Sequence, residues 1–541
     1  MSDTTDDDDH RLEALGYKPS FRREFSNLAT ISFAFSIMGL CSSIATTLNT
    51  PLLLGGPTSV TWCWLLGSCM CFTLGSSIAE IVSAFPTCGG LYTASAQLCP
   101  KSHRAIVGWI VGWLNILGQV AGISSTEFGL ANMIWGAVSI SSPTFQLTQG
   151  KTVGLFAGLL IVHGLLNSLA TRYLAFATRG FVFVNLGTTV VIIIVLLATT
   201  PRSEMHPATY VFGSQGIINQ TGGWNSGIAF LLGLLSVQWT VRDKDYDATA
   251  HISEEVRRAA YAAPAAIFIA VIGTGILGWL LNVVLMLCSG PIENLPGVSE
   301  SAFLQIMALR MGTPVALFLW SFVCLTAFFV AQTALQACSR TVYAFSRDHG
   351  KQQCFPDNGY FGHIANSTRT PLRAIWLTTI LAIIPGFLDL ASPIAANAIF
   401  ALTAIALDLS YIIPIFLRRL YANHPDVNFR PGPFYMGPGL LGWAANVTCI
   451  SWTLFVCVIF SLPTVFPVTK INMNYASVIT VGVVFLSGVW YVLSAHRHYH
   501  GPTSNLDAET KARLGLGEVD ASSVSEKEKD RVLVSLTLNS V

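Results

Sequence analysis

The chain has 541 residues, of which 52% are hydrophobic and only 11% charged, and its mean hydropathy is +0.57. A water-soluble fold of this size would not tolerate that composition, so we expect an integral membrane protein with several spans. The formal net charge of +1 gives no electrostatic reason to expect a nucleic-acid partner, and we expect none. The 12 cysteines lie mostly in apolar runs without metal-ligand spacing, which predicts small buried residues, no disulfide framework, no metal site and no cofactor.

Residues 1–28 are polar and predict a cytoplasmic tail. Their acidic run, Asp6–Asp9, stands where a signal peptide would carry a basic region before an apolar core, so no cleavable signal peptide is expected. Acidic runs of this kind are typical of disordered, solubilising sequence. Residues 496–541 are expected to form a second cytoplasmic tail.

Apolar segments of about 20 residues, the length that crosses a bilayer at 1.5 Å per residue, fill residues 29–495, the predicted transmembrane domain. Membrane helices are expected at 29–54, 60–84, 104–136, 152–171, 179–199, 224–257, 264–288, 313–346, 372–389, 392–417, 440–462 and 476–495. The predicted fold is therefore all-α, with 12 transmembrane helices.

Lys and Arg concentrate in loops that stay in the cytoplasm. With the N-terminus inside, the outer loops hold only Lys151, Arg202, Arg310 and Lys470, and every basic cluster lies inside. This asymmetry predicts that both termini are cytoplasmic, and it requires residues 228–258 to cross the membrane once. We expect the protein in the plasma membrane, with the vacuolar membrane as the alternative.

The sixth predicted helix contains a polar interruption. Its apolar run, Ile228–Val237, is about half the length of a span, and the polar residues Gln238–Asp247 follow it directly. One interpretation is a single crossing made of two half-helices; the other is a short buried helix followed by a solvated charged turn. Broken helices mark the substrate site of secondary transporters, because unwound backbone at membrane depth is tolerated only where it lines a cavity or is buried in protein.

The first predicted helix carries an interruption as well. Gly39–Ser43 lies roughly 15–21 Å along it, near the middle of the membrane. The small hydroxylated residues there can satisfy freed backbone groups, or can simply pack against a neighbouring helix. Matching interruptions in the first and sixth helices indicate two five-helix halves in an inverted repeat, followed by two extra C-terminal helices.

Five groups of residues between Gly16 and Pro502 form recognisable motifs. They are Ala79–Ile81 with Ser83–Tyr92, His163–Asn167, Asp245–Glu255, Ser339–Arg340 with Ala344–Asp348, and Pro467–Thr469 with Asn472–Ala476. In these motifs the chain resembles the amino acid–polyamine–organocation transporters, and within them the fungal amino acid, γ-aminobutyrate and choline permeases. The resemblance implies a proton-coupled permease that imports a small amine-containing solute, such as an amino acid, γ-aminobutyrate or choline. Two alternatives are a nutrient sensor without transport and a polyamine or vacuolar permease.

The chain departs from the family pattern at the sixth helix. Similar proteins usually have Trp-Thr, two residues, and then Asp-Tyr-Asp, whereas here Val241–Lys244 separates Trp239-Thr240 from Asp245–Asp247. The break is two residues longer and more charged. Either the pocket differs or the insertion is an error in the gene model.

The two breaks supply the candidate substrate-binding residues. The second half of the first helix is expected to start near Ile44, and its positive dipole end suits a carboxylate. Trp239 and Tyr246 are candidates for cation–π contact with an amine, although each aromatic can equally serve packing. The full candidate set is Gly39, Cys41, Ser42, Ser43, Ile44, Trp239, Thr240, Asp245, Tyr246, Asp247, Gln332 and Asn397.

Carboxylates inside the predicted helices are candidates for moving protons. Glu127, Asp247 and Asp408 form this group, and for Glu127 the alternative is a side chain that reaches the outer membrane interface. Glu80, Glu254 and Glu255 are predicted to be inner-gate or structural charges. No nucleophile–base pair or phosphate-binding loop is present in the sequence, so we do not expect an enzyme.

Overall fold

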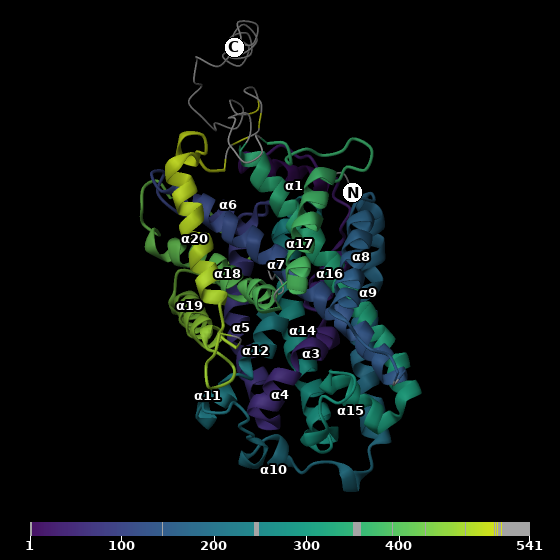
Figure 1. Cartoon of the computed structure of the whole chain (residues 1–541). Coiled ribbons are helices and arrows are strands. Elements are labelled where there is room, and N and C mark those ends of the chain that lie inside the picture. Colours follow the sequence, from purple (N-terminus) through teal and green to yellow (C-terminus); the bar gives the residue numbers. More distant parts are fainter. Residues whose placement is uncertain are drawn as a thin grey trace, which may run out of the picture.

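The computed structural model describes residues 3–142, 144–242, 248–349, 359–391, 393–427, 429–470 and 472–502, together with 504, 506 and 510. These residues form a bundle of helices, whose only strand-like contact is an isolated parallel bridge between Phe25 and Val256. Figure 1 shows long helices running between one end that carries α1 (Asp3–Ala14) and an opposite end that carries α10 (Ala208–Val211) and α15 (Ala302–Met311). We refer to them as the α1 end and the α10 end.

Ten helices of the described residues are long and apolar enough to cross a membrane, counting α2 and α3 as one. With the composition, they make the chain an integral membrane protein. The other nine are α5 (Pro57–Ala84), α7 (Arg104–Ser141), α8 (Gln149–Asn167), α9 (Thr171–Thr199), α14 (Ala259–Cys288), α16 (Thr313–His349), α17 (Leu372–Ala391), α19 (Leu440–Ser461) and α20 (Ala476–Leu493), and α18 (Pro393–Leu420) is a further long helix. The predicted positions of these helices agree with the structure to within about eight residues at each end.

The connections contain further helical segments that the hydropathy pattern does not reveal. They are α1, α6 (Gly90–Gln97), α10, α15 and 3₁₀ turns at Arg202–Glu204, Ser214–Gly216, Ile292–Asn294 and Ala495–Arg497. The expectation of a disordered acidic run in the N-terminal tail is wrong for Asp8 and Asp9. Acidic residues near the N-terminus of α1 and Arg11 in its last turn suit the helix dipole, and the carboxylates of Asp8 and Asp9 bind backbone and side chain elsewhere in the fold.

The predicted interruption of the first helix is present at Gly39. Helix α2 (Asn27–Met38) ends there in the left-handed conformation, with φ +50°, and α3 (Leu40–Thr47) begins at the next residue, followed by α4 (Asn49–Gly55). Only glycine fits this turn, because a Cβ atom at Gly39 would lie 2.1 Å from Cγ2 of Val330. The hydroxyl of Ser43 donates to the Met38 carbonyl at 2.8 Å, and the hydroxyl of Ser42 donates at 2.9 Å to the Gly39 carbonyl, which also accepts the Ser43 amide.

The sixth predicted helix consists of short pieces. Helices α11 (Ser226–Leu231) and α12 (Leu234–Val237) lead into a π-helical turn, Gln238–Arg242. After residues 243–247, which lie outside the described part, the chain continues as α13 (Ala248–His251) and a 3₁₀ turn, Ser253–Glu255. The short buried helix is therefore followed by further helical turns within the fold.

The long helices bring the two breaks together inside the bundle. Helix α7 packs against α8, α16, α17, α18 and α20, while α2 and α3 pack against α9, α14 and α16. Helix α3 also contacts α7 and the π-helical turn Gln238–Arg242. The first break therefore lies beside the second, and α7 packs on α3.

Candidate functional site

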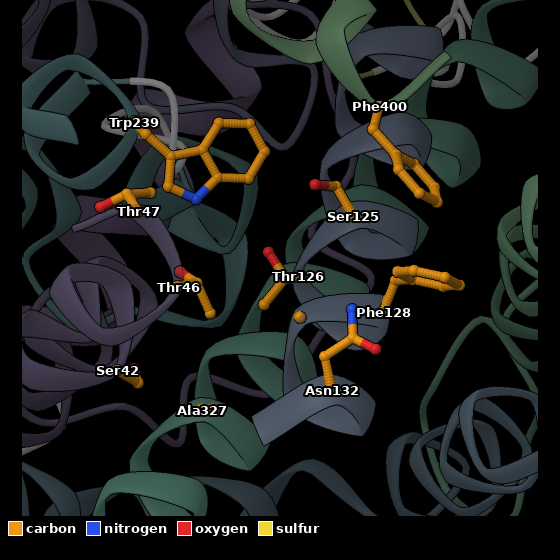
Figure 2. Close-up of a pocket in the computed structure, with 11 residues that line it drawn as sticks. Ser42, Thr46, Thr47, Ser125, Thr126, Phe128, Asn132, Trp239, Ala327 and Phe400 are labelled. Atoms are coloured by element: carbon orange, nitrogen blue, oxygen red, sulfur yellow. The ribbon is translucent and has the colours of Figure 1, made fainter. Parts of the chain in front are cut away.

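A cavity of about 270 Å³ lies between the broken helices and α7. Figure 2 shows Trp239 on one side of it, Phe128 and Phe400 on the other, and Thr46, Thr126 and Asn132 between them. Its lining residues are Ser42, Thr46 and Thr47 of α3, Ser125, Thr126, Phe128, Gly129 and Asn132 of α7, Trp239, Ala327 of α16 and Phe400 of α18. Among the described residues the lining contains hydroxyls, one amide and aromatic rings, and no charged side chain.

The α7 wall of the cavity is a face that sequence reasoning missed. Ser125, Gly129 and Asn132 are spaced four and three residues apart, so they share one side of the helix. At Gly129 a Cβ atom would lie 3.0 Å from Cγ2 of Thr46, so the small residue lets α7 approach α3. The sequence signal of this face is a stripe of small and polar residues in an otherwise apolar helix.

The cavity continues toward the α10 end of the molecule. A second space of about 240 Å³ shares Thr46, Gly129 and Asn132 with the first and extends to Asn49 and Glu300. The side chain of Asn49 fixes this region, donating to the carbonyl of Glu300 at 2.7 Å and accepting from the amide of Ala302 at 2.8 Å. Glu300 is the only ionisable side chain among the described residues that line either space.

The α1 end is closed by two buried ion pairs. Arg340 of α16 donates through Nε to Glu255 at 2.7 Å, and both side chains are fully buried. About two turns further along α16, Arg347 donates to both carboxylate oxygens of Glu254 at 3.2 Å. Glu254 also accepts from the backbone amide of Cys88 at 3.1 Å. The segment after the second break is thus attached to α16 and to the turn before α6.

The N-terminal segment packs over the same ion pairs. The Phe25 amide donates to the Glu255 carbonyl at 3.0 Å, and the guanidinium of Arg23 donates to the carbonyls of Ser253 and Val256 at 3.2 and 2.9 Å. Arg23 also pairs with Asp9 of α1 at 3.0 Å. Residues before the first membrane helix therefore hold the segment after the second break in place.

Tyr17 joins this end of the molecule to the tip of α16. Its hydroxyl donates to Asp348 at 3.3 Å, and Tyr92 donates to the same carboxylate oxygen at 2.8 Å. Arg347 stacks over the Tyr17 ring, 4.3 Å from its centroid. Burial, with a further contribution from the Asp348 carboxylate, raises the pKa of Tyr17 well above its ordinary value, so its hydroxyl keeps its proton and remains a donor.

Glu80 belongs to a separate ion pair. It accepts from Arg418 of α18 and from the amide of Met436 at 3.2 Å. The Arg418 guanidinium also lies 4.6 Å from the ring centroid of Phe429. These contacts hold the loop after α18 against α5, whereas Glu254 and Glu255 hold the segment after the second break.

The structure distributes the predicted substrate-binding residues over several places. Ser42 and Trp239 line the cavity and Gly39 forms the break, with α3 beginning at Leu40, four residues before the expected Ile44. Five other candidates make contacts away from the cavity: the Cys41 thiol lies 3.7 Å from the Thr326 hydroxyl, Ser43 donates to the Met38 carbonyl, and Ile44 lies in the core. Thr240 donates to the Ser236 carbonyl, and the carbonyl of Gln332 accepts from Asn167. The remaining candidates, Asp245, Tyr246, Asp247 and the side chain of Asn397, lie outside the described residues.

The two described proton candidates lie apart from one another. Asp408 of α18 is fully buried, and its Oδ2 lies 3.7 Å from the Cys457 thiol of α19. Glu127 is also fully buried, so the alternative in which it reaches a membrane interface is wrong. Its carboxylate lies 3.0 Å from Nδ1 of His163, a partner that sequence reasoning missed. No group of three or more His, Cys, Asp or Glu side chains suited to a metal occurs in the part of the chain the structure describes.

Comparison with known proteins agrees with this architecture. The sequence profile of the family described as "Amino acid permease" matches residues 25–485. The chain is 42% identical over 520 residues to an uncharacterized amino-acid permease of Schizosaccharomyces pombe, covering 94% of this chain and 92% of that protein. It is 35% identical to amino-acid permease 2 of Neurospora crassa, with coverage of 93% and 90%, and 32% identical to the GABA-specific permease of Saccharomyces cerevisiae, with coverage of 95% and 89%.

The helical bundle, its apolar spans and these relatives define a membrane transport protein. The chain belongs to the amino acid permease family, as its motifs predicted. Among solved structures, a manganese transporter mutant of Eremococcus coleocola is similar with a TM-score of 0.49 and 13% identity, over 90% of this chain and 95% of that one.

Proposed function

We propose that this permease is a proton-coupled secondary transporter that imports a small amino acid, with γ-aminobutyrate as the leading candidate, across the plasma membrane. The observation that carries the proposal is the cavity between the two breaks, which continues toward the α10 end and is shut off from the α1 end by buried ion pairs. Access from one side at a time is what an alternating-access transporter requires.

The orientation follows from the distribution of basic residues. If the α1 end is cytoplasmic, as the positive-inside pattern predicts, the structure represents an outward-facing state. Substrate then enters past Asn49 and Glu300 and reaches the space between Thr46 and Asn132. In this proposal the twelve spans form two inverted five-helix halves, with α2–α3 and α11–α13 as corresponding broken helices and α19 and α20 as the additional pair.

The cavity lining supports a zwitterionic substrate. The amides of Leu40, Cys41 and Ser42 form the first turn of α3 and have no acceptor within their own helix, so this end suits a carboxylate. Trp239 offers a ring face for an amine, and Asp245 and Asp247 remain candidates for pairing with it. A zwitterion uses both ends of such a site. Choline, which has no carboxylate, uses only one of them and is the weaker candidate.

The proposed cycle requires the α1 end to open. The pairs of Arg340 with Glu255 and of Arg347 with Glu254 must separate, and each is buried, so opening costs several kcal/mol unless water enters with the movement. Trp239 lies in the π-helical turn at the second break, so contact between the substrate and Trp239 provides a means of shifting the segment that bears both glutamates. Glu254 and Glu255 therefore act as the inner gate in this proposal.

The test is uptake of labelled γ-aminobutyrate, choline and a panel of amino acids by cells that lack their own permeases, at an acidic and a near-neutral external pH. We expect acid-stimulated uptake of one zwitterionic compound, and its loss in Trp239→Ala and Asp247→Asn. Uptake that does not depend on external pH would contradict the proton-coupled part of the proposal. Protein that reaches the cell surface, binds an amino acid and transports nothing would instead support the nutrient-sensor alternative.

A further inference from the structure

Glu127 of α7 and His163 of α8 form a pair of ionisable side chains in the interior of the bundle. Their oxygen and nitrogen atoms, Oε2 and Nδ1, are 3.0 Å apart, and both side chains are fully buried. Neither makes a second ion pair within the described part of the chain. The imidazole also packs on Phe328 of α16, with ring centroids 4.2 Å apart.

We propose that Glu127 and His163 together bind the proton that is coupled to transport. This inference rests on the proposed proton-coupled function and identifies where its proton resides. The pair carries no net charge when it holds one proton, whether as neutral acid and imidazole or as carboxylate and imidazolium. When the proton leaves, a carboxylate and a neutral imidazole remain, with a net charge of minus one.

Burial makes that change in charge energetically important. A carboxylate without a compensating partner is strongly unfavourable in an apolar interior, whereas the neutral or ion-paired form is tolerated. Histidine is suited to this exchange because its ordinary titration lies near physiological pH. The proton binds from the outer side and leaves to the inner side, so the step needs no other reactant.

The neighbouring helices carry few other ionisable groups near the pair. On α16, Cys324 lies one turn from Phe328, and Arg340 and Arg347 are occupied by Glu255 and Glu254. On α18, Asp408 contacts Cys457 of α19. On α17, Gly386 lies against Phe156 of α8, which is two turns before His163. Asp389 lies one turn beyond Gly386. Helix α9 contributes its amide Asn185, which donates to the Phe35 carbonyl at 3.1 Å.

The pair lies next to the cavity wall along α7. Thr126 and Phe128, the residues on either side of Glu127, both line the cavity, and Ala327, next to Phe328, lines it from α16. Phe128 also packs on Phe156 of α8, with ring centroids 5.9 Å apart. A change of charge at the pair therefore acts on two walls of the substrate cavity, although neither side chain contacts the substrate.

Asn167 connects the helical turn that bears His163 to α16. Its amide group donates to the carbonyl of His163 at 3.1 Å and to the carbonyl of Gln332 on α16 at 3.3 Å. This bridge ties the end of α8 to α16, one turn beyond the ring of Phe328. The pair is thus held against the same helix that carries Arg340 and Arg347 of the inner gate.

The experiment compares Glu127→Gln, His163→Gln and the matched control Asp389→Asn, which alters a buried carboxylate of α17 that has no histidine partner. Each is expressed in cells lacking their own permeases and tested with the substrate that the wild type imports. Two readouts are needed: net uptake at acidic and near-neutral external pH, and substrate-for-substrate exchange in preloaded cells, which does not require the proton to leave.

In Glu127→Gln and His163→Gln we expect net uptake to lose its acid stimulation and substrate-induced proton entry to disappear, while exchange continues. Asp389→Asn should retain all three. Glu127→Asp, which keeps a titratable carboxyl, should recover part of the acid stimulation, and this distinguishes a proton site from a structural pair. Retained exchange shows that a variant is folded. If Glu127→Gln shows no exchange, the acid stimulation of uptake in Glu127→Asp tests the inference instead.

Acid-stimulated uptake with proton entry in both Glu127→Gln and His163→Gln would overturn the inference and leave the proposed function standing. Wild-type uptake that is indifferent to pH would overturn both. A purely structural pair predicts loss of surface protein and of exchange in parallel with uptake, with no separate effect on the pH profile.

Discussion

The hydroxyl oxygens of Thr47 and Ser236 lie 2.7 Å apart and join the two broken helices beside the cavity. The Thr47 hydroxyl also lies 2.8 Å from the carbonyl of Ser43, to which it donates, so Ser236 is the donor to Thr47. The pair connects α3 to α12 at the side from which the cavity is reached. Movement of either broken helix must therefore carry the other or break this bond.

Removing either hydroxyl should weaken transport by a similar amount. Thr47→Val and Ser236→Ala each delete the bond between the two hydroxyls, worth about 1 kcal/mol or roughly fivefold in substrate affinity, and the double variant should lose little more than either. Thr47→Val also deletes the bond to the Ser43 carbonyl within α3, a kind of bond that contributes little to a helix. Thr47→Ser keeps the oxygen and serves as the control. Concentration-dependent uptake measures the effect, and strictly additive losses would show that the two hydroxyls act independently.

Gly39→Ala should abolish transport and reduce the amount of folded protein. An L-residue in the left-handed conformation costs roughly 1–2 kcal/mol, and the new Cβ would also lie 2.1 Å from Val330. The control is Gly158→Ala on α8, where a Cβ atom meets nothing within 4 Å. Adding Val330→Ala should restore part of the folded protein, because it removes the collision and leaves the strained φ. Fluorescence-detected size-exclusion chromatography and uptake provide the two readouts.

Glu300→Gln should raise KM for a cationic substrate such as choline at low ionic strength, and should change KM for a zwitterion, which has no net charge, much less. Glu300 is exposed at the mouth of the cavity, so its charge attracts cations over a distance that salt reduces. We expect the difference from the wild type to shrink as salt is added, with maximal velocity unchanged. A salt-independent increase in KM would mean that Glu300 binds the substrate directly.

Cys88 offers a measure of how far the α1 end is open. Its thiol is fully buried, and burial raises its pKa well above the ordinary value, so little reactive thiolate is present while this end is closed. Arg23→Ala removes bonds to Ser253 and Val256 and should increase maleimide labelling of Cys88 severalfold in inside-out vesicles. Arg22→Ala, which alters an exposed neighbour, should not.

Maleimide labelling of the other cysteines is measured in Cys88→Ala and subtracted from the total. Equal labelling in Arg23→Ala and Arg22→Ala would show that the N-terminal segment does not hold this end closed. Addition of the transported substrate should raise Cys88 labelling in the wild type, because inward opening is part of the proposed cycle.

Tyr17 predicts a pH dependence of stability. Its pKa is raised in the fold above the ordinary value of 10.0, so the native state binds the proton more tightly than the unfolded chain does, and stability is lost as the pH rises through 10 and beyond. Tyr17→Phe should lower stability near neutral pH by about 1 kcal/mol, the worth of its bond to Asp348, and should lose less stability on alkalinisation. Thermal melting of detergent-solubilised protein across pH tests both; parallel curves for the two proteins would contradict the assignment.

Much of the helical framework could be predicted because it depends on local patterns. Runs of apolar residues specify spans one at a time, and Gly39 and the polar stretch after Val237 mark breaks without reference to any partner. The contacts between spans could not be predicted in this way. His163 stands alone in an apolar helix, and only the packing of α8 on α7 brings it to Glu127, 36 residues earlier in the chain.

The N-terminal segment shows the same limit. Its acidic composition is typical of solvated tails, and the partners that hold it, the amide of Arg258 and the segment Ser253–Val256, lie more than 200 residues away. The cavity face of α7 was visible as a stripe of small and polar residues, but choosing that face over the opposite one required the position of α3.

The bridge between Phe25 and Val256 and the bond from Tyr17 to Asp348 also set an order of events during synthesis. A ribosome adds roughly 5–20 residues per second, so tens of seconds pass between the emergence of the N-terminal segment and that of α16. Until then the first residues of the chain have no site to occupy. The closure of the α1 end is therefore completed only after α16 has been made, although the chain begins with it.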